Sequence, residues 1–213
     1  MTAYRTAARI AEAELVIKKS RFIGRAAPAQ TVEAATAFVT IVKAAHHDAA
    51  HNVWAYLLRD GQQRYSDDGE PQGTAGQPIL ETLQKQGLAD CVIVVTRYFG
   101  GILLGAGGLT RAYGQAASAA IEAAGVVTME PCRVLRVTCD YGVYGALQRL
   151  APAHGAVVLD TRFTDTVTVT LRLHVENADV FAAQLAERSN GRVRAAVLRE
   201  EFAVMEDRMN GGN

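Results

Sequence analysis

The stretch CVIVVTRYFGGILLGAGGLTRAY, residues 91–113, decides the core of the fold. Its first residues form an apolar, β-branched run that is too short for a buried helix, so we expect a buried strand over 91–96. Five glycines follow, and then a helix that runs from near Gly108 to Ala124 and ends at Gly125. A second loop, YSDDGEPQGTAG at 65–76, lies just upstream. Ordering glycine costs more backbone entropy than ordering any other residue. Two glycine-rich loops of this kind therefore indicate a surface whose shape serves a specific role.

Composition narrows the class of protein. The chain has 213 residues, of which 49% are hydrophobic and 21% charged, as in a globular protein. Lysine plus arginine number 22 and aspartate plus glutamate also 22, so any binding of nucleic acid or anionic membrane must be local. We expect Cys91, Cys132 and Cys139 to be reduced strand residues. No apolar run approaches the ~20 residues of a membrane span, and the first residues carry no signal-type segment, so we expect a cytoplasmic protein without membrane contact.

The residue composition and the pattern of expected helices and strands change at Pro131. This change predicts one domain over 1–130 and a second over 131–205, followed by a frayed tail at 206–213. In the first domain we expect strands at 15–19 and 21–26, a helix at 31–45 capped by Thr31, a strand at 53–59 and a helix at 78–86 closed by Gly87. Ser20 is a bend, a bulge or part of one continuous strand. The second domain reads as strand 134–139, helix 144–153, strands 156–163 and 166–175, helix 177–189 and strand 191–198. The fold class is therefore α+β, with a ferredoxin-like βαββαβ order in the second domain.

The strand, glycine loop and helix around residues 97–111 form an arrangement that presents backbone amides to an anion. The standard nucleotide signatures are absent: a P-loop needs lysine and serine or threonine after Gly105, and the dinucleotide pattern needs glycine where Thr110 stands. The glycines either permit tight turning and close packing, or they form an anion- or partner-binding surface. Arginines and aromatic residues in the same stretch favour a surface that contacts phosphate, carboxylate, bases or a peptide.

The candidate binding residues for an anion, RNA or a partner combine this loop with the basic cluster of the KKSRF segment. They are Arg97, Tyr98, Phe99, Gly100, Gly101, Gly105, Gly107, Gly108, Arg111, Lys18, Lys19 and Arg21. The alternative for the basic cluster is a solvated strand face.

The acidic loop is a second candidate site, formed by Ser66, Asp67, Asp68, Gly69, Glu70, Gly73 and Thr74. Asp67, Asp68 and Glu70 have the chemistry to hold magnesium, and adjacent aspartates followed by glycine and proline also form ordinary turns. His47 and His51 would share one face if the helix continued, which suggests a metal site together with His46. No His-Glu-x-x-His motif is present and the expected strand at 53–56 breaks the helical geometry, so a loop cluster is favoured over a metal site. No serine elbow or cysteine with a recognisable partner is present, so we assign no catalytic residue and no cofactor, with magnesium as the alternative.

Three motifs in order identify a family resemblance: KKSRFI at 18–23, YSDDGEPQGTAGQPIL at 65–80 and VIVVTRYFGGILLGAGGLTRAY at 92–113. Together they closely resemble the IMPACT family, in its bacterial YigZ-type branch. The family signature of arginine, two aromatics, two glycines, two residues, an aliphatic residue and glycine falls on residues 97–105. The resemblance implies a first domain with the fold of ribonuclease PH and of the second domain of a small-subunit ribosomal protein. It also implies a second, ferredoxin-like domain similar to the last domain of elongation factor G.

The resemblance also bears on function. Eukaryotic relatives act in translational control by binding the activator of an initiation-factor kinase, chiefly through an additional N-terminal domain for which this chain has no room before residues 4–25. We therefore expect a non-catalytic protein that binds RNA, the ribosome or a translation-related protein and regulates translation. One alternative is a magnesium-dependent enzyme acting on a phosphorylated small molecule or on RNA. The other is a protein-binding scaffold in which Tyr98 and Phe99 dock a peptide.

Overall fold

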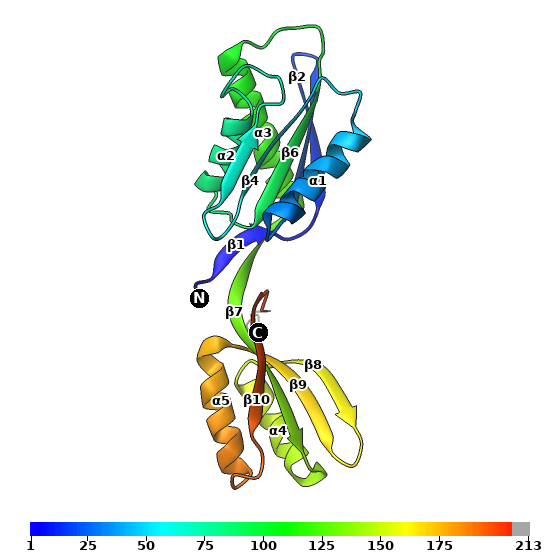
Figure 1. The fold of residues 1–213 in the computed structure, drawn as a ribbon. Coiled ribbons are helices and arrows are strands. Elements are labelled where there is room, and N and C mark those ends of the chain that lie inside the picture. The colour runs from blue at the N-terminus through cyan, green and yellow to red at the C-terminus, as the bar shows by residue number, and fades with distance from the viewer. Residues whose placement is uncertain (206–213) are drawn as a thin grey trace, which may run out of the picture. The chain divides into compact units, whose positions relative to one another are not determined.

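The computed structural model describes residues 1–205 and shows an α+β protein (Figure 1). The frayed tail expected at 206–213 lies outside the described residues. The chain divides into two compact units, one of residues 4–128 and the other of residues 1–3 with the chain from Met129 onward. The domain boundary expected from the sequence lies between residues 130 and 131. Within the described part of the chain, none of the helices has the length and apolar character needed to cross a bilayer.

The first unit is built on an antiparallel sheet with the strand order β2-β3-β6-β4-β5. These strands are β2 (Ala11–Ile17), β3 (Ser20–Pro28), β4 (His51–Leu57), β5 (Gln63–Ser66) and β6 (Cys91–Tyr98). Helix α1 (Val32–Ala45) covers one face, and α2 (Gly76–Lys85) and α3 (Ala106–Ala124) cover the other (Figure 1). The central strand β6 sends Ile93 and Val95 into the α2/α3 core and Val92 and Val94 into the α1 core. Burial on both faces explains why its sequence is a continuous apolar run.

The ends of the helices follow the predicted capping chemistry. Thr31 precedes α1, and its hydroxyl accepts a hydrogen bond of 3.1 Å from the amide of Ala34. Gly125 follows α3 with a φ of 68°, a left-handed conformation that glycine adopts without strain. Gly87, just beyond α2, has a φ of 64°.

The prediction for the first strands needs correction. Residues 15–19 and 21–26 belong to a hairpin in which Lys18 and Lys19 form the turn, with φ values of 46° and 65°, and Ser20 begins β3. Two central residues of positive φ are typical of the hairpin turns that match strand twist. Lys18 and Lys19 are therefore turn residues, and neither lies on a strand face. The short strands β1 (Tyr4–Ala7) and β5 were also absent from the prediction.

The second unit has the predicted βαββαβ order: β7 (Val126–Cys139), α4 (Tyr141–Ala153), β8 (Val157–Phe163), β9 (Val167–His174), α5 (Val175–Arg188) and β10 (Ala195–Ala203). Its antiparallel strands follow the order β10-β7-β9-β8, and α4 and α5 share one core with them. Strand β7 begins earlier than expected, so Pro131 lies inside it. His174 precedes α5, whereas Asn177 was predicted to cap this helix.

Candidate functional site

A cavity of about 470 Å³ in the first unit joins the two loops that the sequence singled out. The acidic loop contributes Glu70 and Pro71, and the glycine loop contributes Arg97 and the residues that follow it. The full lining is Ala50, His51, Glu70, Pro71, Arg97, Phe99, Leu103, Leu104, Gly105, Ala106 and Leu109. The size is that of a small-ligand site, with mostly apolar walls and a few polar groups.

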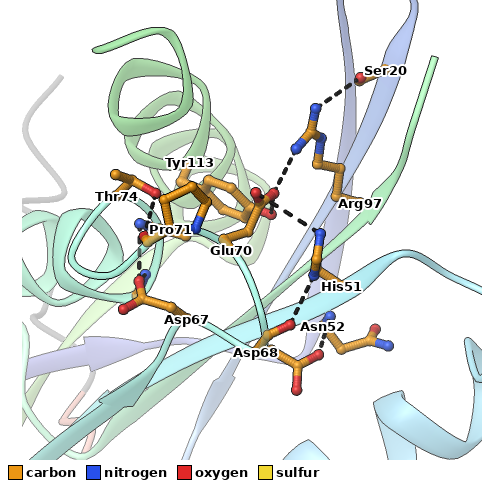
Figure 2. A network of polar contacts seen from close by, with 12 residues as sticks. Ser20, His51, Asn52, Asp67, Asp68, Glu70, Pro71, Thr74, Arg97 and Tyr113 are labelled. Atoms are coloured by element: carbon orange, nitrogen blue, oxygen red, sulfur yellow. Dashed lines mark hydrogen bonds and ion pairs between the residues drawn. The ribbon is translucent and has the colours of Figure 1, made fainter. Parts of the chain in front are cut away.

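Glu70 is the centre of the polar side of this cavity (Figure 2). Its side chain is only 3% exposed, and its Oε1 atom accepts hydrogen bonds from Arg97 Nη1 at 2.6 Å and from the hydroxyl of Tyr113 at 2.7 Å. Arg97 also donates from Nη2 to the hydroxyl of Ser20 at 3.4 Å. The carboxylate and the guanidinium thus form a buried ion pair, and a hydroxyl extends the network at each end.

Tyr113 reaches this network from α3 and is fully buried. Its ring meets Phe22 edge to face, with 5.3 Å between the ring centroids. Burial, reinforced by the negative charge of Glu70, raises the pKa of Tyr113. The phenol therefore stays protonated and acts as a fixed donor to Glu70.

His51, on β4, supplies the second polar group of the cavity. Its Nδ1 atom lies 2.8 Å from the backbone oxygen of Asp68 (Figure 2). A carbonyl oxygen only accepts hydrogen bonds, so Nδ1 carries the hydrogen. The other ring nitrogen, Nε2, lies 3.9 Å from Oε2 of Glu70.

The three carboxylates of the acidic loop point to different partners. Asp67 accepts backbone N–H groups at the start of α2, with Oδ1 2.8 Å from the amide of Gly76 and Oδ2 2.8 Å from that of Gly73. Asp68 accepts from Lys43 at 2.5 Å and from the amide of Asn52 at 2.6 Å. Within residues 1–205, no three histidine, cysteine or acidic side chains gather as a metal site would require. The set suggested for magnesium, residues 67, 68 and 70, does not converge.

The remaining residues of the acidic loop shape its backbone. The Ser66 hydroxyl accepts from the amide of Asp68 at 3.2 Å, and the Thr74 hydroxyl donates to the carbonyl of Pro71 at 2.6 Å. Gly69 has a φ of 89°, a conformation that side chains rarely adopt, and a Cβ there would lie 3.4 Å from the ring of His51. The loop is held in one shape that presents Glu70 inward.

The glycine loop packs directly against the hairpin turn formed by Lys18 and Lys19. A Cβ atom at Gly100 would lie 2.0 Å from the backbone carbonyl carbon of Lys19, so only glycine fits. The amide of Gly100 donates to the hydroxyl of Ser20 at 3.2 Å. Ser20 is fully buried and was not among the residues predicted for the candidate site. Its position between two basic residues concealed its contact with a loop about 80 residues away.

The other candidate residues take distinct places. Phe99 and Leu103 are 52% and 82% exposed, and the turn lysines Lys18 and Lys19 are also exposed. Tyr98 is half-buried, and its hydroxyl contacts the ring of His46 at 2.8 Å.

Two arginines of the candidate set are engaged elsewhere. Arg21 forms a two-pronged pair with Glu14, both distances being 2.9 Å. Arg111 lines a separate groove between α2 and α3, so the structure does not bring it together with Arg97.

The glycines of the candidate set have two roles. Gly101 and Gly105 have φ values of 81° and 72°, which the loop needs to turn. Gly107 and Gly108 belong to the first turn of α3, which has no side-chain cap.

Both units match families known from other proteins. Residues 18–121 match the Impact N-terminal domain, and residues 137–192 match a domain of unknown function, DUF1949. The chain is 35% identical over 209 residues to the IMPACT family member YvyE of Bacillus subtilis, covering 97% of this chain and 95% of the relative. The chain belongs to the IMPACT family.

Two further comparisons support this membership. The IMPACT family member YigZ of Escherichia coli is 37% identical over 188 residues, which cover 86% of this chain and 92% of that relative. A solved structure described as that of a hypothetical protein matches with a TM-score of 0.62 and 33% identity, covering 93% of this chain and 98% of its own. The stretch matching the Impact N-terminal domain contains every residue of the Glu70 network described above.

Proposed function

We propose that this IMPACT-family protein is a cytoplasmic regulator of translation that binds single-stranded RNA without chemistry of its own. The observation that carries the proposal is the contact between the exposed glycine loop and the lysine turn. It places the exposed ring of Phe99 and the charges of Lys18 and Lys19 on adjoining segments. Aromatic rings stack on bases and lysines neutralise phosphates, which is the usual combination for single-strand binding.

The charges in this region favour the lysines over the arginines as phosphate ligands. Arg97 is buried against Glu70, and Arg21 is paired with Glu14. Lys18 and Lys19 have no ion-pair partner in the described part of the chain. If each lysine neutralises one phosphate, log K should fall with log salt with a slope of about −1.4.

The acidic loop supports binding over magnesium-dependent catalysis. Asp67 and Asp68 are already engaged by backbone amides and by Lys43. A cation at this loop would have to displace these donors. The hydrogen bonds instead support a structural role for both aspartates.

The fold is part of the proposal. We propose that the first unit shares the fold of ribonuclease PH and of the second domain of a small-subunit ribosomal protein. The second unit would correspond to the last domain of elongation factor G. Both folds recur in proteins that contact RNA or the ribosome, which supports a partner of this kind by analogy.

The test uses variants that remove charge without disturbing the turn. Lys18→Asn with Lys19→Gly removes both charges and introduces the Asn-Gly pair that this turn type prefers. Arg64→Gln with Lys85→Gln removes two exposed charges elsewhere in the same unit and is the matched control. We expect the turn variant to abolish the salt dependence of binding to a single-stranded RNA, and the control to retain it.

A second pair of variants tests the aromatic contact. Phe99→Ala should weaken RNA binding by about 1–3 kcal/mol, the usual contribution of one stacked base. Phe163→Ala, which truncates a similarly exposed ring in the second unit, should leave RNA binding unchanged. RNA binding that ignores both salt and Phe99 would refute the proposal. Partner capture that survives ribonuclease treatment would favour the protein-binding scaffold, which the exposed Leu103 would then serve.

A further inference from the structure

Only one of the two carboxylate oxygens of Glu70 accepts hydrogen bonds within the described residues. Oε1 accepts from both Arg97 and Tyr113, whereas Oε2 receives no hydrogen bond from any residue between 1 and 205. The nearest polar group given for it is Nε2 of His51, at 3.9 Å, which is beyond hydrogen-bond distance. The Glu70 side chain is only 3% exposed, yet Oε2 is not among the fully buried side-chain atoms that lack a partner, so this oxygen stays accessible to a donor from outside the chain. Because Glu70 lines the cavity, its unused oxygen indicates a ligand that brings a donor.

The charges around Glu70 define that donor as neutral. The ion pair with Arg97 already balances the carboxylate, so a cationic ligand would add a positive charge that has no counter-charge left in the pair. A phosphate group would bring negative charge against Oε2. Hydroxyl groups meet neither objection, because they donate a hydrogen bond and carry no charge.

His51 places a second acceptor beside the first. Its Nδ1 hydrogen is committed to the carbonyl of Asp68, which leaves Nε2 as the ring nitrogen that can accept a hydrogen bond. Two acceptors 3.9 Å apart suit two hydroxyls on neighbouring carbons, each donating to one of them. The adjoining 2′- and 3′-hydroxyls of a ribose are such a pair, and a carboxylate that binds a ribose hydroxyl is a recurring arrangement in nucleotide sites.

The walls of the cavity suit the rest of a nucleoside. Phe99 offers a ring for a base, and Leu104 and Leu109 form an apolar side. Glu70 and Arg97 on the polar side are buried, and a nucleoside bound there needs two free hydroxyls to reach both acceptors. Only the last nucleotide of an RNA chain has both hydroxyls free.

We propose that this cavity binds the 3′-terminal nucleoside of an RNA strand, with its two ribose hydroxyls donating to Oε2 of Glu70 and Nε2 of His51. The inference rests on the proposed RNA-binding function and makes it specific for the end of the strand. The phosphodiester backbone then leaves the cavity toward solvent, where the turn lysines are exposed.

The experiment compares RNAs that differ only at the 3′ end. The probe is one single-stranded RNA of about eight nucleotides, labelled at its 5′ end and prepared with a terminal diol, a 2′-deoxy, a 3′-deoxy or a 3′-phosphate nucleotide. We expect each deoxy end to bind about tenfold or more weakly than the diol, because a hydrogen bond to a buried acceptor is lost. The 3′-phosphate end should bind more weakly still. Equal affinity for all four ends, with the salt dependence intact, overturns the inference and leaves the proposed function standing. Failure of every RNA to bind overturns both.

A histidine pair gives the protein side of the test. His51→Ala removes Nε2 and should reduce the preference for the diol end, whereas His47→Ala changes an exposed histidine and should keep it. The ratio of the two affinities is the readout, because a general loss of structure would weaken both ends alike. An unchanged ratio in His51→Ala contradicts the assignment of this residue.

Discussion

Replacing Gly100 by alanine tests the close packing of the glycine loop against the hairpin turn. The added Cβ would lie 2.0 Å from the carbonyl carbon and 2.1 Å from the oxygen of Lys19, and 2.4 Å from the amide nitrogen of Ser20. All three atoms belong to the backbone, so no side-chain rotation relieves the overlap. Overpacking of this kind costs about 1–3 kcal/mol, and loss of the hydrogen bond between Gly100 and Ser20 adds about 0.5–1.5 kcal/mol. We expect the free energy of unfolding of the first unit to fall by about 2–4 kcal/mol.

The assay is urea unfolding followed by tryptophan fluorescence. Trp54 is the single tryptophan of the chain and lies on β4, so its signal reports the first unit alone. Gly107→Ala is the matched control, because the nearest atom to its added Cβ is 4.0 Å away and the residue lies in a helix. This control should be neutral or stabilising by up to about 1 kcal/mol. A Gly100→Ala variant within about 0.5 kcal/mol of the wild type, a surface-like effect, would refute the reasoning.

Three further predictions concern groups that are buried or partly buried. Arg97→Met leaves Glu70 charged and unpaired, so the first unit should lose about 3–5 kcal/mol, and adding Glu70→Gln should restore part of it in a double-mutant cycle; additive losses would contradict the pairing. Asp67→Ala removes the acceptor for the amides before α2 and should cost about 0.5–2 kcal/mol by the Trp54 assay, while an unchanged midpoint would exclude this capping role. Burial raises the pKa of Cys91 to about 12, so the native thiol should resist alkylation at pH 8. Since the unfolded thiol ionises at about pH 8.5, the stabilisation from the buried neutral thiol is complete below that pH and is lost as the pH rises toward 12. A Cys91→Ala variant should lose stability less steeply over this range.

Local patterns predicted the parts of the fold that local physics decides. Strand β6 is recognisable because burial on both faces requires apolar residues without interruption, and α1 because Thr31 caps it. The hairpin turn was missed because Lys18 and Lys19 carry none of the glycine or asparagine signals of a left-handed conformation. Contact with the glycine loop holds that turn in place, and a contact of this kind cannot be read from neighbouring residues.

In the candidate site, too, features set by neighbouring residues were predicted, and contacts between distant residues were not. Both loops were identified from their glycines and acids, whereas the burial of Arg97, a candidate ligand for an anion or a partner, and its pairing with Glu70 were not predicted. Its partner Glu70 lies 27 residues away, and Ser20 lies 77 residues away. Tyr113 was treated only as part of the family motif, because its hydrogen bond spans 43 residues. Such partners become visible only when the fold brings β3, β6, α3 and the acidic loop together.

The spacing of the acidic loop now has a physical explanation. Asp67 ties the loop to the start of α2, and Asp68 ties it to β4 and, through Lys43, to α1. With both sides anchored, Glu70 is held against Arg97 before any ligand arrives. A preformed acceptor reduces the ordering cost of binding, so the anchors contribute to affinity without contacting the ligand. Loosening either anchor should therefore weaken binding at the Glu70 cavity even where the ion pair with Arg97 survives.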